Sequence, residues 1–190
     1  FNQPSGITTD GTNLYVADSM NNLIRKIVIS TGVVTTLAGT GSNGSANGTG
    51  TSASFNYPSG ITTDGTNLYV ADSNNHLIRK IVISTGVVTT VAGTGSSGSA
   101  NGTGTSASFN YPYGITTNGT NLYVTETSNH LIRKIVISTG VVTTVAGTGS
   151  SGSANGTGTS ASFNQPSGIT TDGTNLYVAD LGNHLIRQIE

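Results

Sequence analysis

The fold is decided by residues 58–92, which read PSGITTDGTNLYVADSNNHLIRKIVISTGVVTTVA. Four short segments in this stretch are rich in β-branched and aromatic residues, and turn residues lie between them. The segments predict four strands, over residues 60–63, 67–71, 77–83 and 87–92. The third segment carries apolar residues at both parities, which is expected of a strand covered on both faces.

Short polar links join the predicted strands. Asp64-Gly65-Thr66 is a hairpin-type turn, because glycine tolerates a positive φ and aspartate can hydrogen-bond to nearby backbone. Ser84-Thr85-Gly86 has hairpin length as well, and residues 72–75 form a polar link of four residues. The sequence therefore predicts a four-stranded antiparallel meander.

The pattern repeats every 54 residues, and each repeat opens with phenylalanine and asparagine at Phe1, Phe55, Phe109 and Phe163. Three full repeats occupy residues 1–54, 55–108 and 109–162, and an incomplete repeat occupies residues 163–190. Long regular periods are typical of solenoids, propellers and arrays. We therefore expect one all-β domain of stacked repeats.

A long connection, residues 93–111, links one meander to the next. It consists largely of Gly, Ser, Thr, Asn and Ala, and it recurs with nearly the same residues in each full repeat. Connections of this length without structure are uncommon in compact domains. We expect an ordered loop anchored by Ala107 and Phe109; the alternative is a flexible Gly/Ser linker.

Composition narrows the classes of function. The chain has 7 Lys and Arg against 8 Asp and Glu, and no cysteine. This balance provides no basic field for a phosphate backbone, so we expect no nucleic-acid partner. No apolar run approaches the roughly 20 residues of a membrane span, so we expect a soluble protein without a membrane partner.

The sequence leaves the compartment open. Cysteine-free chains occur both in the cytosol and outside the cell, and a secreted bacterial-type or recombinant protein is among the alternatives. The first residues lack the charged and apolar regions of a signal peptide, so we expect any targeting segment to be absent or removed.

The link before the third strand carries a recurrent motif. Asn75-His76-Leu77 recurs at residues 129–131 and 183–185, each time after Leu-Tyr-Val and an acidic residue. Together with Pro58-Ser59-Gly60-Ile61 and residues 64–72, it resembles the NHL repeat family, and the resemblance extends along all 190 residues. It implies a β-propeller in which each repeat is a four-stranded blade around a central channel. Asn22 in place of histidine, and Thr125-Glu126 in place of Ala-Asp, depart from the pattern but leave the fold prediction unchanged.

An acidic residue and an arginine recur seven residues apart in every repeat. We expect structural ion pairs or turn caps that fix each blade, because arginine and carboxylate geometry is specific. The alternative is a ring of charged groups that face a ligand in the channel. The pairs are Asp18 and Arg25, Asp72 and Arg79, Glu126 and Arg133, and Asp180 and Arg187.

The sequence predicts no metal and no cofactor. His76, His130 and His184 fall on separate blades, whereas metal ligands must converge on one ion. Asp10-Gly11-Thr12-Asn13 resembles the start of a calcium loop but lacks the glutamate at the required spacing. Glycosylation sequons such as Asn101-Gly102-Thr103 arise readily in a chain of this composition.

No catalytic motif appears, so we expect a protein that is not an enzyme. Active sites need different groups at one place, and the few departures from the repeat do not form such a set. We favour a structural or interaction module that presents Thr, Asn, Tyr and His to a protein or glycan. The alternatives are a metal-dependent hydrolase or lyase acting in the channel, and an RNA-binding propeller.

The last repeat stops after its third predicted strand, Leu185 to Glu190. An unpaired strand edge can pair with another chain, so we expect self-association. Either one chain closes a small ring of about four blades, or two chains join into a ring of about eight. We favour the homodimer, because four blades are the lower limit of the usual range. The near-identity of the repeats also suggests a recently amplified or engineered (de novo) array.

Overall fold

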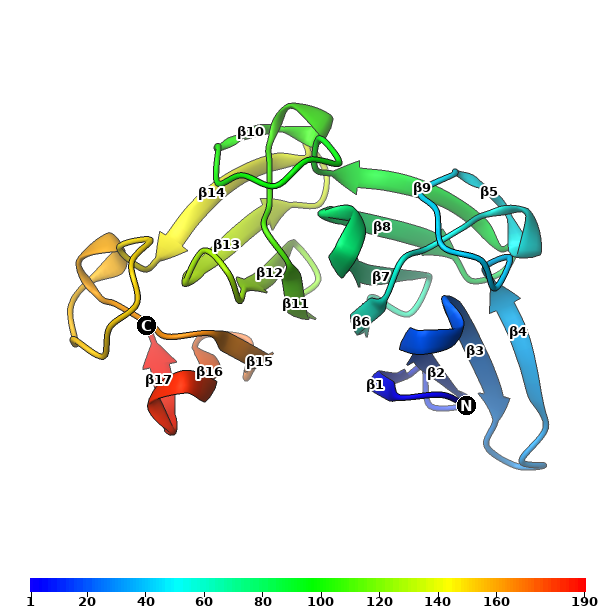
Figure 1. Ribbon diagram of the computed structural model, residues 1–190. Coiled ribbons are helices and arrows are strands. Elements are labelled where there is room, and N and C mark those ends of the chain that lie inside the picture. Colours follow the sequence, from blue (N-terminus) through cyan, green and yellow to red (C-terminus); the bar gives the residue numbers. More distant parts are fainter.

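The computed structural model describes residues 1–190 as an all-β protein with four antiparallel sheets. The sheets stand side by side as four blades of a β-propeller, in the order of the sequence (Figure 1). Their first strands line the inner rim of an open arc, and blade 1 and blade 4 lie at its two ends. The predicted fold class, with three full blades and one incomplete blade, is confirmed.

The first strand of each blade is the innermost, and the order within the blade is that of the chain. Blade 1 consists of β1 (Pro4–Thr9), β2 (Asn13–Asp18), β3 (Leu23–Val28) and β4 (Val34–Ala38). Blade 2 has β6 (Pro58–Thr63), β7 (Asn67–Asp72), β8 (Leu77–Val82) and β9 (Val87–Ala92). Blade 3 has β11 (Pro112–Thr117), β12 (Asn121–Glu126), β13 (Leu131–Val136) and β14 (Val141–Ala146). Blade 4 has β15 (Pro166–Thr171), β16 (Leu176–Asp180) and β17 (Leu185–Ile189).

The four predicted strands of the second repeat are all present, with small differences at their ends. The first begins at Pro58 rather than Gly60, and a bulge between Pro58 and Ile61 interrupts its register with β7. The links after the second strand of blades 1, 2 and 4 contain short 3-10 helices, which the sequence pattern does not predict. These are η1 (Ser19–Asn21), η3 (Ser73–Asn75) and η6 (Leu181–Asn183).

The long connections cross from one blade to the next and add a strand there. β5 (Gly48–Thr49) pairs with β9 of blade 2, and β10 (Gly102–Thr103) pairs with β14 of blade 3. A 3-10 turn follows each crossing, in η2 (Gly50–Ser52), η4 (Gly104–Ser106) and η5 (Gly158–Ser160). Blades 2 and 3 are therefore five-stranded, which sequence analysis did not predict.

The predicted anchors of this loop are confirmed. Ala107 and Phe109 are fully buried, and they pack in one cluster with residues of blades 2 and 3, such as Ile78 and Leu122. The loop also forms backbone hydrogen bonds, among them the N–H of Gly104 to the carbonyl of Gly140. It is an ordered wedge between neighbouring blades and not a flexible linker.

Glycine is required where the inner strands approach each other. A Cβ atom at Gly60 would collide with the carbonyl oxygen of Tyr113 on the next blade, and one at Gly6 would collide with the carbonyl oxygen of Ser59. Gly168 holds the same position in blade 4, but no blade follows it, and the nearest atom is the Cβ of Ala179 at 3.8 Å. Because glycine has no side chain, the inner strands of neighbouring blades can approach this closely at Gly6 and Gly60.

Gly60→Ala is expected to lower the free energy of unfolding by about 1–3 kcal/mol, because the added methyl group forces the backbones of two blades apart. Gly168→Ala, measured at a concentration too low for two chains to associate, is the matched control and should change it by less than about 0.5 kcal/mol. Urea unfolding followed by circular dichroism measures both. Equal losses in the two variants would contradict the proposed role of Gly60.

Candidate functional site

Each acidic residue of the recurrent pairs ends the second strand of its blade and meets the arginine on the third. In blade 2, Arg79 Nη1 donates to Asp72 Oδ2 at 2.9 Å, and both side chains are fully buried. Asp72 also accepts the backbone N–H of Asn56 at 2.8 Å and the side-chain amide of Asn75 at 2.8 Å. The carboxylate therefore joins the loop, the second strand and the third strand.

The arginine also hydrogen-bonds to the long connection that leads from the preceding blade. Arg79 donates to the carbonyl oxygens of Ser54 and Ala46 and to Oδ1 of Asn47, at 3.0–3.1 Å. Its guanidinium carbon lies 5.2 Å from the centre of the Phe55 ring. One buried cation thus joins the middle of the loop to the segment that enters blade 2.

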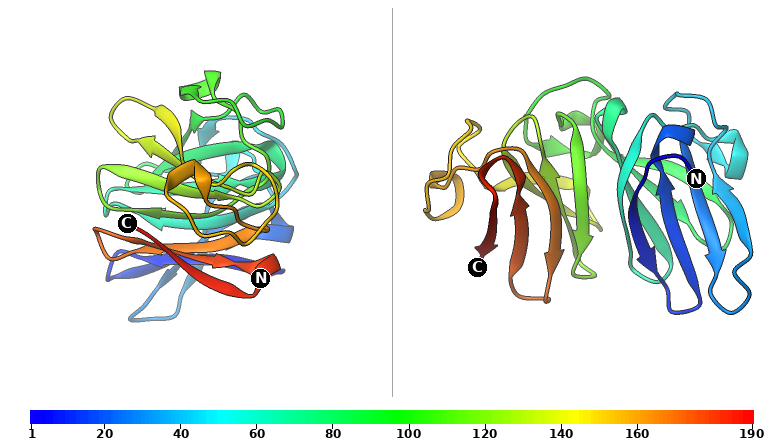
Figure 2. Two further views of the ribbon diagram at one scale, coloured as in Figure 1. Left: turned by 90° about the vertical axis from the view of Figure 1, so that its left-hand side faces the viewer. Right: turned by 60° about the horizontal axis from the view of Figure 1, so that its bottom comes forward.

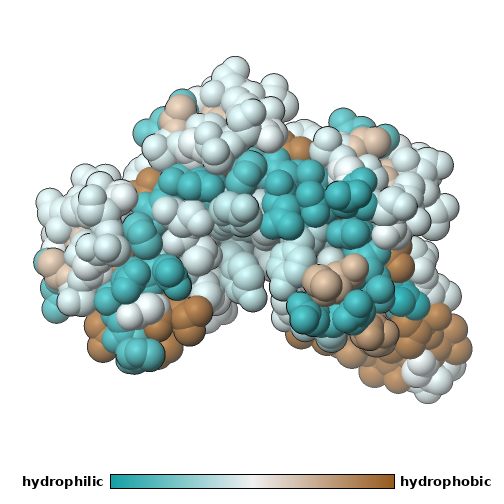
Figure 3. Space-filling view, in the orientation of Figure 1, coloured by the Kyte–Doolittle hydropathy of each residue, from teal (hydrophilic) through white to brown (hydrophobic).

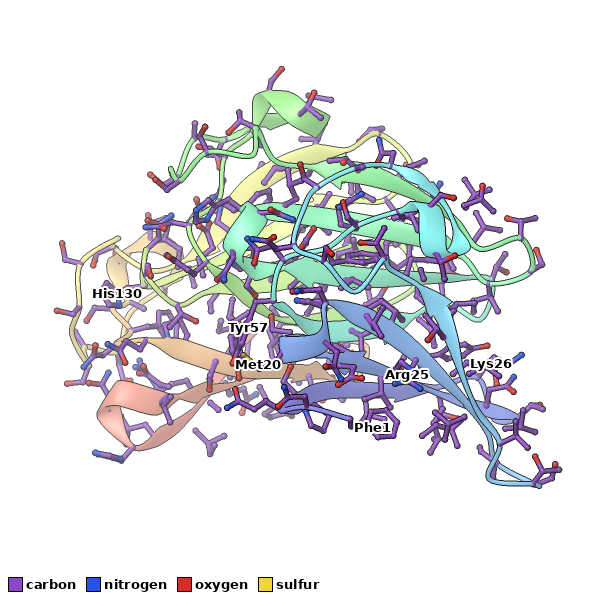
Figure 4. All side chains as sticks on the ribbon, turned by 45° about the vertical axis from the view of Figure 1, so that its right-hand side comes forward. Phe1, Met20, Arg25, Lys26, Tyr57 and His130 are labelled. Atoms are coloured by element: carbon purple, nitrogen blue, oxygen red, sulfur yellow. The ribbon has the colours of Figure 1, made fainter.

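The structure forms the same ion pair in all four blades. Arg25 to Asp18 and Arg187 to Asp180 each measure 3.1 Å, and Arg133 bonds to Glu126. Arg25 is the most exposed of the four arginines, and its guanidinium makes no hydrogen bond to a connecting loop. Figure 4 shows Arg25 beside Phe1 at the edge of the molecule, with 5.2 Å from the guanidinium carbon to the ring centre.

Burial disfavours the ionised form of these carboxylates and so tends to raise their pKa. It raises the pKa of Asp72 to about 6, although the hydrogen bonds of Asn56, Asn75 and Arg79 favour the ionised form. In blade 1, where the surroundings are more open, the hydrogen bond from Asn2 leads the contacts that lower the pKa of Asp18. The pairs lie inside the blades, and none of their residues lines the central channel.

Arg79→Gln is expected to destabilise the protein by about 3–5 kcal/mol, because it leaves a buried carboxylate without its cation. Arg25→Gln, in the same position of blade 1, should lower the free energy of unfolding clearly less, since Arg25 is partly exposed and hydrogen-bonds to no incoming loop. Urea unfolding of both variants provides the comparison. A stably folded Arg79→Gln variant would favour a functional rather than a structural role.

The histidines bond to the loop of the following blade. His76 has φ 55°, and its Nδ1 accepts the backbone N–H of Tyr111 at 3.2 Å. His130 Nδ1 accepts the N–H of Gln165 at 3.0 Å. Asn22 does the same in blade 1, where its Oδ1 accepts the N–H of Tyr57 at 2.9 Å. The asparagine therefore replaces the imidazole without loss of the contact.

These contacts need an unprotonated Nδ1, so they depend on pH. Burial lowers the pKa of His76. The contribution of His76 to stability is therefore complete above its unfolded pKa of about 6.5 and declines as the pH falls through that value toward the lower folded pKa. His76→Asn should match the parent at pH 7.5 and become the more stable of the two below pH about 6.

Chemical unfolding of the parent and of His76→Asn at several pH values measures this difference, and the carboxylates common to both chains cancel. His184→Asn, measured at a concentration too low for two chains to associate, is the control, because no blade lies beyond blade 4 within one chain. A pH profile of His76→Asn identical to that of the parent would contradict the role given to the imidazole.

Hydroxyl groups join the inner strands of neighbouring blades. Ser59 Oγ donates to the carbonyl of Tyr113 at 2.9 Å, and Ser73 Oγ donates to the carbonyl of Pro112 at 2.5 Å. In blade 3, where tyrosine replaces this serine, Thr125 Oγ1 donates to the carbonyl of Ser167 at 2.6 Å instead. Thr125 replaces the alanine of the other blades and supplies the hydrogen bond that the missing serine hydroxyl would make. The ring of Tyr113 can therefore lie at the surface.

The channel is an open hollow of about 340 Å³ that is lined by the inner strands. Its walls are copies of Ile-Thr, as in Ile61 and Thr62, with neighbouring glycines, serines and Tyr113. No acidic, basic or imidazole group lines it. The structure also contains no cluster of three or more His, Cys, Asp or Glu residues that could hold a metal ion, and no helix long and apolar enough to cross a membrane.

Tyrosine side chains gather on one face of the arc, between blades 2 and 3. Tyr57, Tyr111 and Tyr113 line a shallow hollow of about 340 Å³ together with Asn74 and Thr127. His76 meets the Tyr111 ring edge-on, with 5.0 Å between ring centres. Figure 4 labels Tyr57, and Figure 3 shows a hydrophilic band along the arc. Sequence analysis named tyrosine as a presented residue but could not place it.

Comparison with known proteins supports the family that the motif suggests and the propeller fold of the blades. Residues 55–81 match the NHL repeat family. The chain is an NHL-repeat β-propeller protein. The human NHL repeat-containing protein 2 is 35% identical over 158 residues, which are 75% of this chain and 22% of the human protein. The chain thus spans about a fifth of that relative.

Solved structures share the propeller fold. A protein of unknown function from Bacteroides thetaiotaomicron superposes with a TM-score of 0.81 at 24% identity, over 98% of this chain and 47% of the other. An auxiliary nutrient binding protein from the same organism has a TM-score of 0.71 at 22% identity, over 94% and 45%. Virginiamycin B lyase from Staphylococcus aureus has a TM-score of 0.60 at 22% identity, over 97% and 54%. Proteins that share this fold thus include one named as a nutrient binding protein and one named as a lyase.

Proposed function

We propose that this chain is a non-enzymatic interaction scaffold that pairs with a second copy of itself to close a ring. The observation that carries the proposal is the exposure, at the two ends of the arc, of residues that are buried between blades elsewhere. Ile7 on blade 1 is 60% exposed, whereas Ile61 and Ile115 in the same position are 5% and 6% exposed. Ile186 on blade 4 is 76% exposed, whereas Ile78 and Ile132 are fully buried.

The two ends have complementary chemistry. In the interior, the face that holds Ile78 packs against the face that holds Ile115. The free end of blade 4 repeats the first face, and the free end of blade 1 repeats the second. Figure 3 shows hydrophobic surface at both ends of the arc. The same contact between two chains is head-to-tail, and such contacts form a closed ring when the rotation closes.

Two chains complete such a ring because each supplies about half of it. The arc superposes on just under half of a larger protein, 47% of its length, with a TM-score of 0.81. Two arcs of four blades then make a ring of about eight, within the usual range for propellers. Exposed apolar faces of this kind mark interaction sites on soluble proteins.

The binding surface that we assign to the scaffold is the face with Tyr57, Tyr111 and Tyr113. Tyrosine combines apolar area with a polar tip and suits protein and glycan partners alike. The channel lacks acidic, basic and imidazole side chains, which supports a binding role over a hydrolase or lyase with a metal in the channel. The near-neutral net charge of −1 supports the absence of an RNA partner.

Light scattering after size exclusion tests the homodimer at micromolar concentration. The expected mass is twice the 19.1 kDa of one chain. Ile7→Asp places a charge on the face of blade 1, and Gly168→Val blocks the close approach of a following inner strand; either variant should give the mass of one chain. Val141→Asp, at a 38% exposed position of blade 3, is the control and should keep the parent mass. A parent chain that is monomeric throughout would overturn the proposal.

A further inference from the structure

The hollow beside Tyr57, Tyr111 and Tyr113 lies at one end of the blades. In the right-hand view of Figure 2, the links after the second strands lie at the upper end of the blades, and the hairpins after the first strands lie at the lower end. The three tyrosines line the hollow together with residues 73–74 and 127–128, which belong to two of these links. We call it the tyrosine hollow. It lies between blades 2 and 3, away from the ends of the arc.

Differences between the repeats gather in the tyrosine hollow. The three full repeats differ at ten positions, which in the third repeat are residues 111, 113, 118, 125–128, 130, 145 and 151. Four of these positions supply every residue that lines the hollow. Exposure alone does not explain this, because Val87 and Val141 are 37% and 38% exposed and yet repeat without change. The chain therefore varies this surface while it keeps the frame around it.

The tyrosine rings are held in place and still exposed. Tyr111 is 47% exposed and Tyr113 is 38% exposed. The backbone of Tyr111 has φ 50°, which is uncommon for a bulky residue. His76 supports it with the hydrogen bond to its N–H and with the edge-on contact to its ring. A ligand therefore meets rings that are already positioned, which lowers the ordering cost of binding.

The hydroxyl groups of these rings differ from those of the tyrosines in the sheets. Tyr15 and Tyr69 donate to aspartates of their own blades, at 2.7 Å and 2.9 Å. The hydroxyls of Tyr111 and Tyr113 have no partner in the chain, and Tyr57 reaches only Gln3 Oε1 at 3.4 Å. The tyrosines of the hollow thus keep their hydrogen-bonding capacity for a ligand.

The backbone beside the hollow does not suit a peptide strand. The N–H of Tyr57 donates to Asn22 Oδ1, and the N–H of Tyr111 donates to His76 Nδ1. A peptide that adds a strand needs free backbone groups along an edge, and here side chains of the preceding blade already bind them. Recognition at this surface therefore depends on side chains.

The side chains that line the hollow are all uncharged. A charged ligand would find no opposite charge there. The hollow offers aromatic faces, with the amide of Asn74 and the hydroxyl of Ser128 beside them. Aromatic rings pack against apolar C–H surface, and a few placed polar groups orient a ligand. A neutral sugar ring has both an apolar C–H face and hydroxyl groups, so it matches this surface.

We propose that the tyrosine hollow is a carbohydrate-binding site for a neutral sugar residue of an oligosaccharide. The C–H face of the sugar ring packs on Tyr111 and Tyr113, and its hydroxyls hydrogen-bond to Asn74, Ser128 and the tyrosine hydroxyls. This inference rests on the proposed function, because it gives a ligand class to the binding surface assigned there.

A panel of immobilised oligosaccharides tests the site. The panel holds neutral chains of glucose, galactose, mannose and N-acetylglucosamine, and sialylated and sulfated forms of the galactose chains. We expect the parent protein to bind at least one neutral chain, and high salt to leave this binding unchanged because no ion pair contributes to it. Absence of binding to every neutral chain, or binding only to the sialylated or sulfated forms, would overturn the proposal.

Variants at one position of the repeat assign the binding to the hollow. Tyr111→Gln keeps the fold, because Gln3 and Gln165 hold this position in other blades with φ 46° and 53°. It should weaken binding at least about tenfold, whereas Tyr111→Phe keeps the ring and should stay within about threefold of the parent. Gln165→Asn, at the same position of blade 4 and outside the hollow, is the control and should bind like the parent. Equal affinity of Tyr111→Gln and Gln165→Asn would contradict the site.

Light scattering of the same samples separates this inference from the proposed function. A parent chain that forms the dimer but binds no neutral oligosaccharide overturns the carbohydrate site alone. A monomeric parent whose oligosaccharide binding is lost in Tyr111→Gln overturns the ring alone. Binding to a peptide library that depends on Tyr111, without binding to any oligosaccharide, would assign the surface to a protein partner and overturn the carbohydrate site.

Discussion

The packing of one blade against the next, with the connecting loop wedged between them, is the interaction on which the structure depends. No blade has a closed core of its own. Residues of blade 1 such as Ile24 are buried only because Ile61 and Leu68 of blade 2 and the loop residue Phe55 cover them. Apolar area removed from water in this way stabilises the fold by about 25 cal/mol per Å². Where the covering blade is absent, at the ends of the arc, the same residues are exposed.

Polar groups fix the position of this wedge. In blades 2, 3 and 4 the arginine hydrogen-bonds to the backbone of the incoming loop. In blades 1, 2 and 3 an asparagine or histidine before the third strand accepts a backbone N–H of the outgoing loop. Arg79 and His76 therefore join blade 2 to both of its neighbours. A buried ion pair adds little to stability on balance, so we attribute to it the alignment of loop and blade. The acid and arginine of each repeat, which the sequence predicts as structural ion pairs or turn caps, form an ion pair within each blade.

Much of the fold could be predicted from residues 58–92, because turns and strand patterns depend on neighbours in the sequence. Asp64-Gly65 predicts the hairpin in which it lies. The burial of Phe109 could be predicted because it is an apolar residue at the end of a polar loop. The pairing of Gly48–Thr49 with β9 could not be predicted, since it joins residues about 40 positions apart through backbone groups that any sequence carries. The hydrogen bond of His76 could not be predicted for the same reason, because its partner is a backbone amide on the next repeat.

The curvature of the arc is also absent from the sequence pattern, because the angle between blades arises from many contacts of the wedge rather than from any single residue. Hydrogen exchange of the parent chain tests the wedge most directly. The account predicts that the amides of Gly104, Ala107 and Ser108 in the connecting loop exchange as slowly as those of β8 and β13. Exchange of these loop amides at the rate of an unstructured peptide, with the strands still protected, would contradict it.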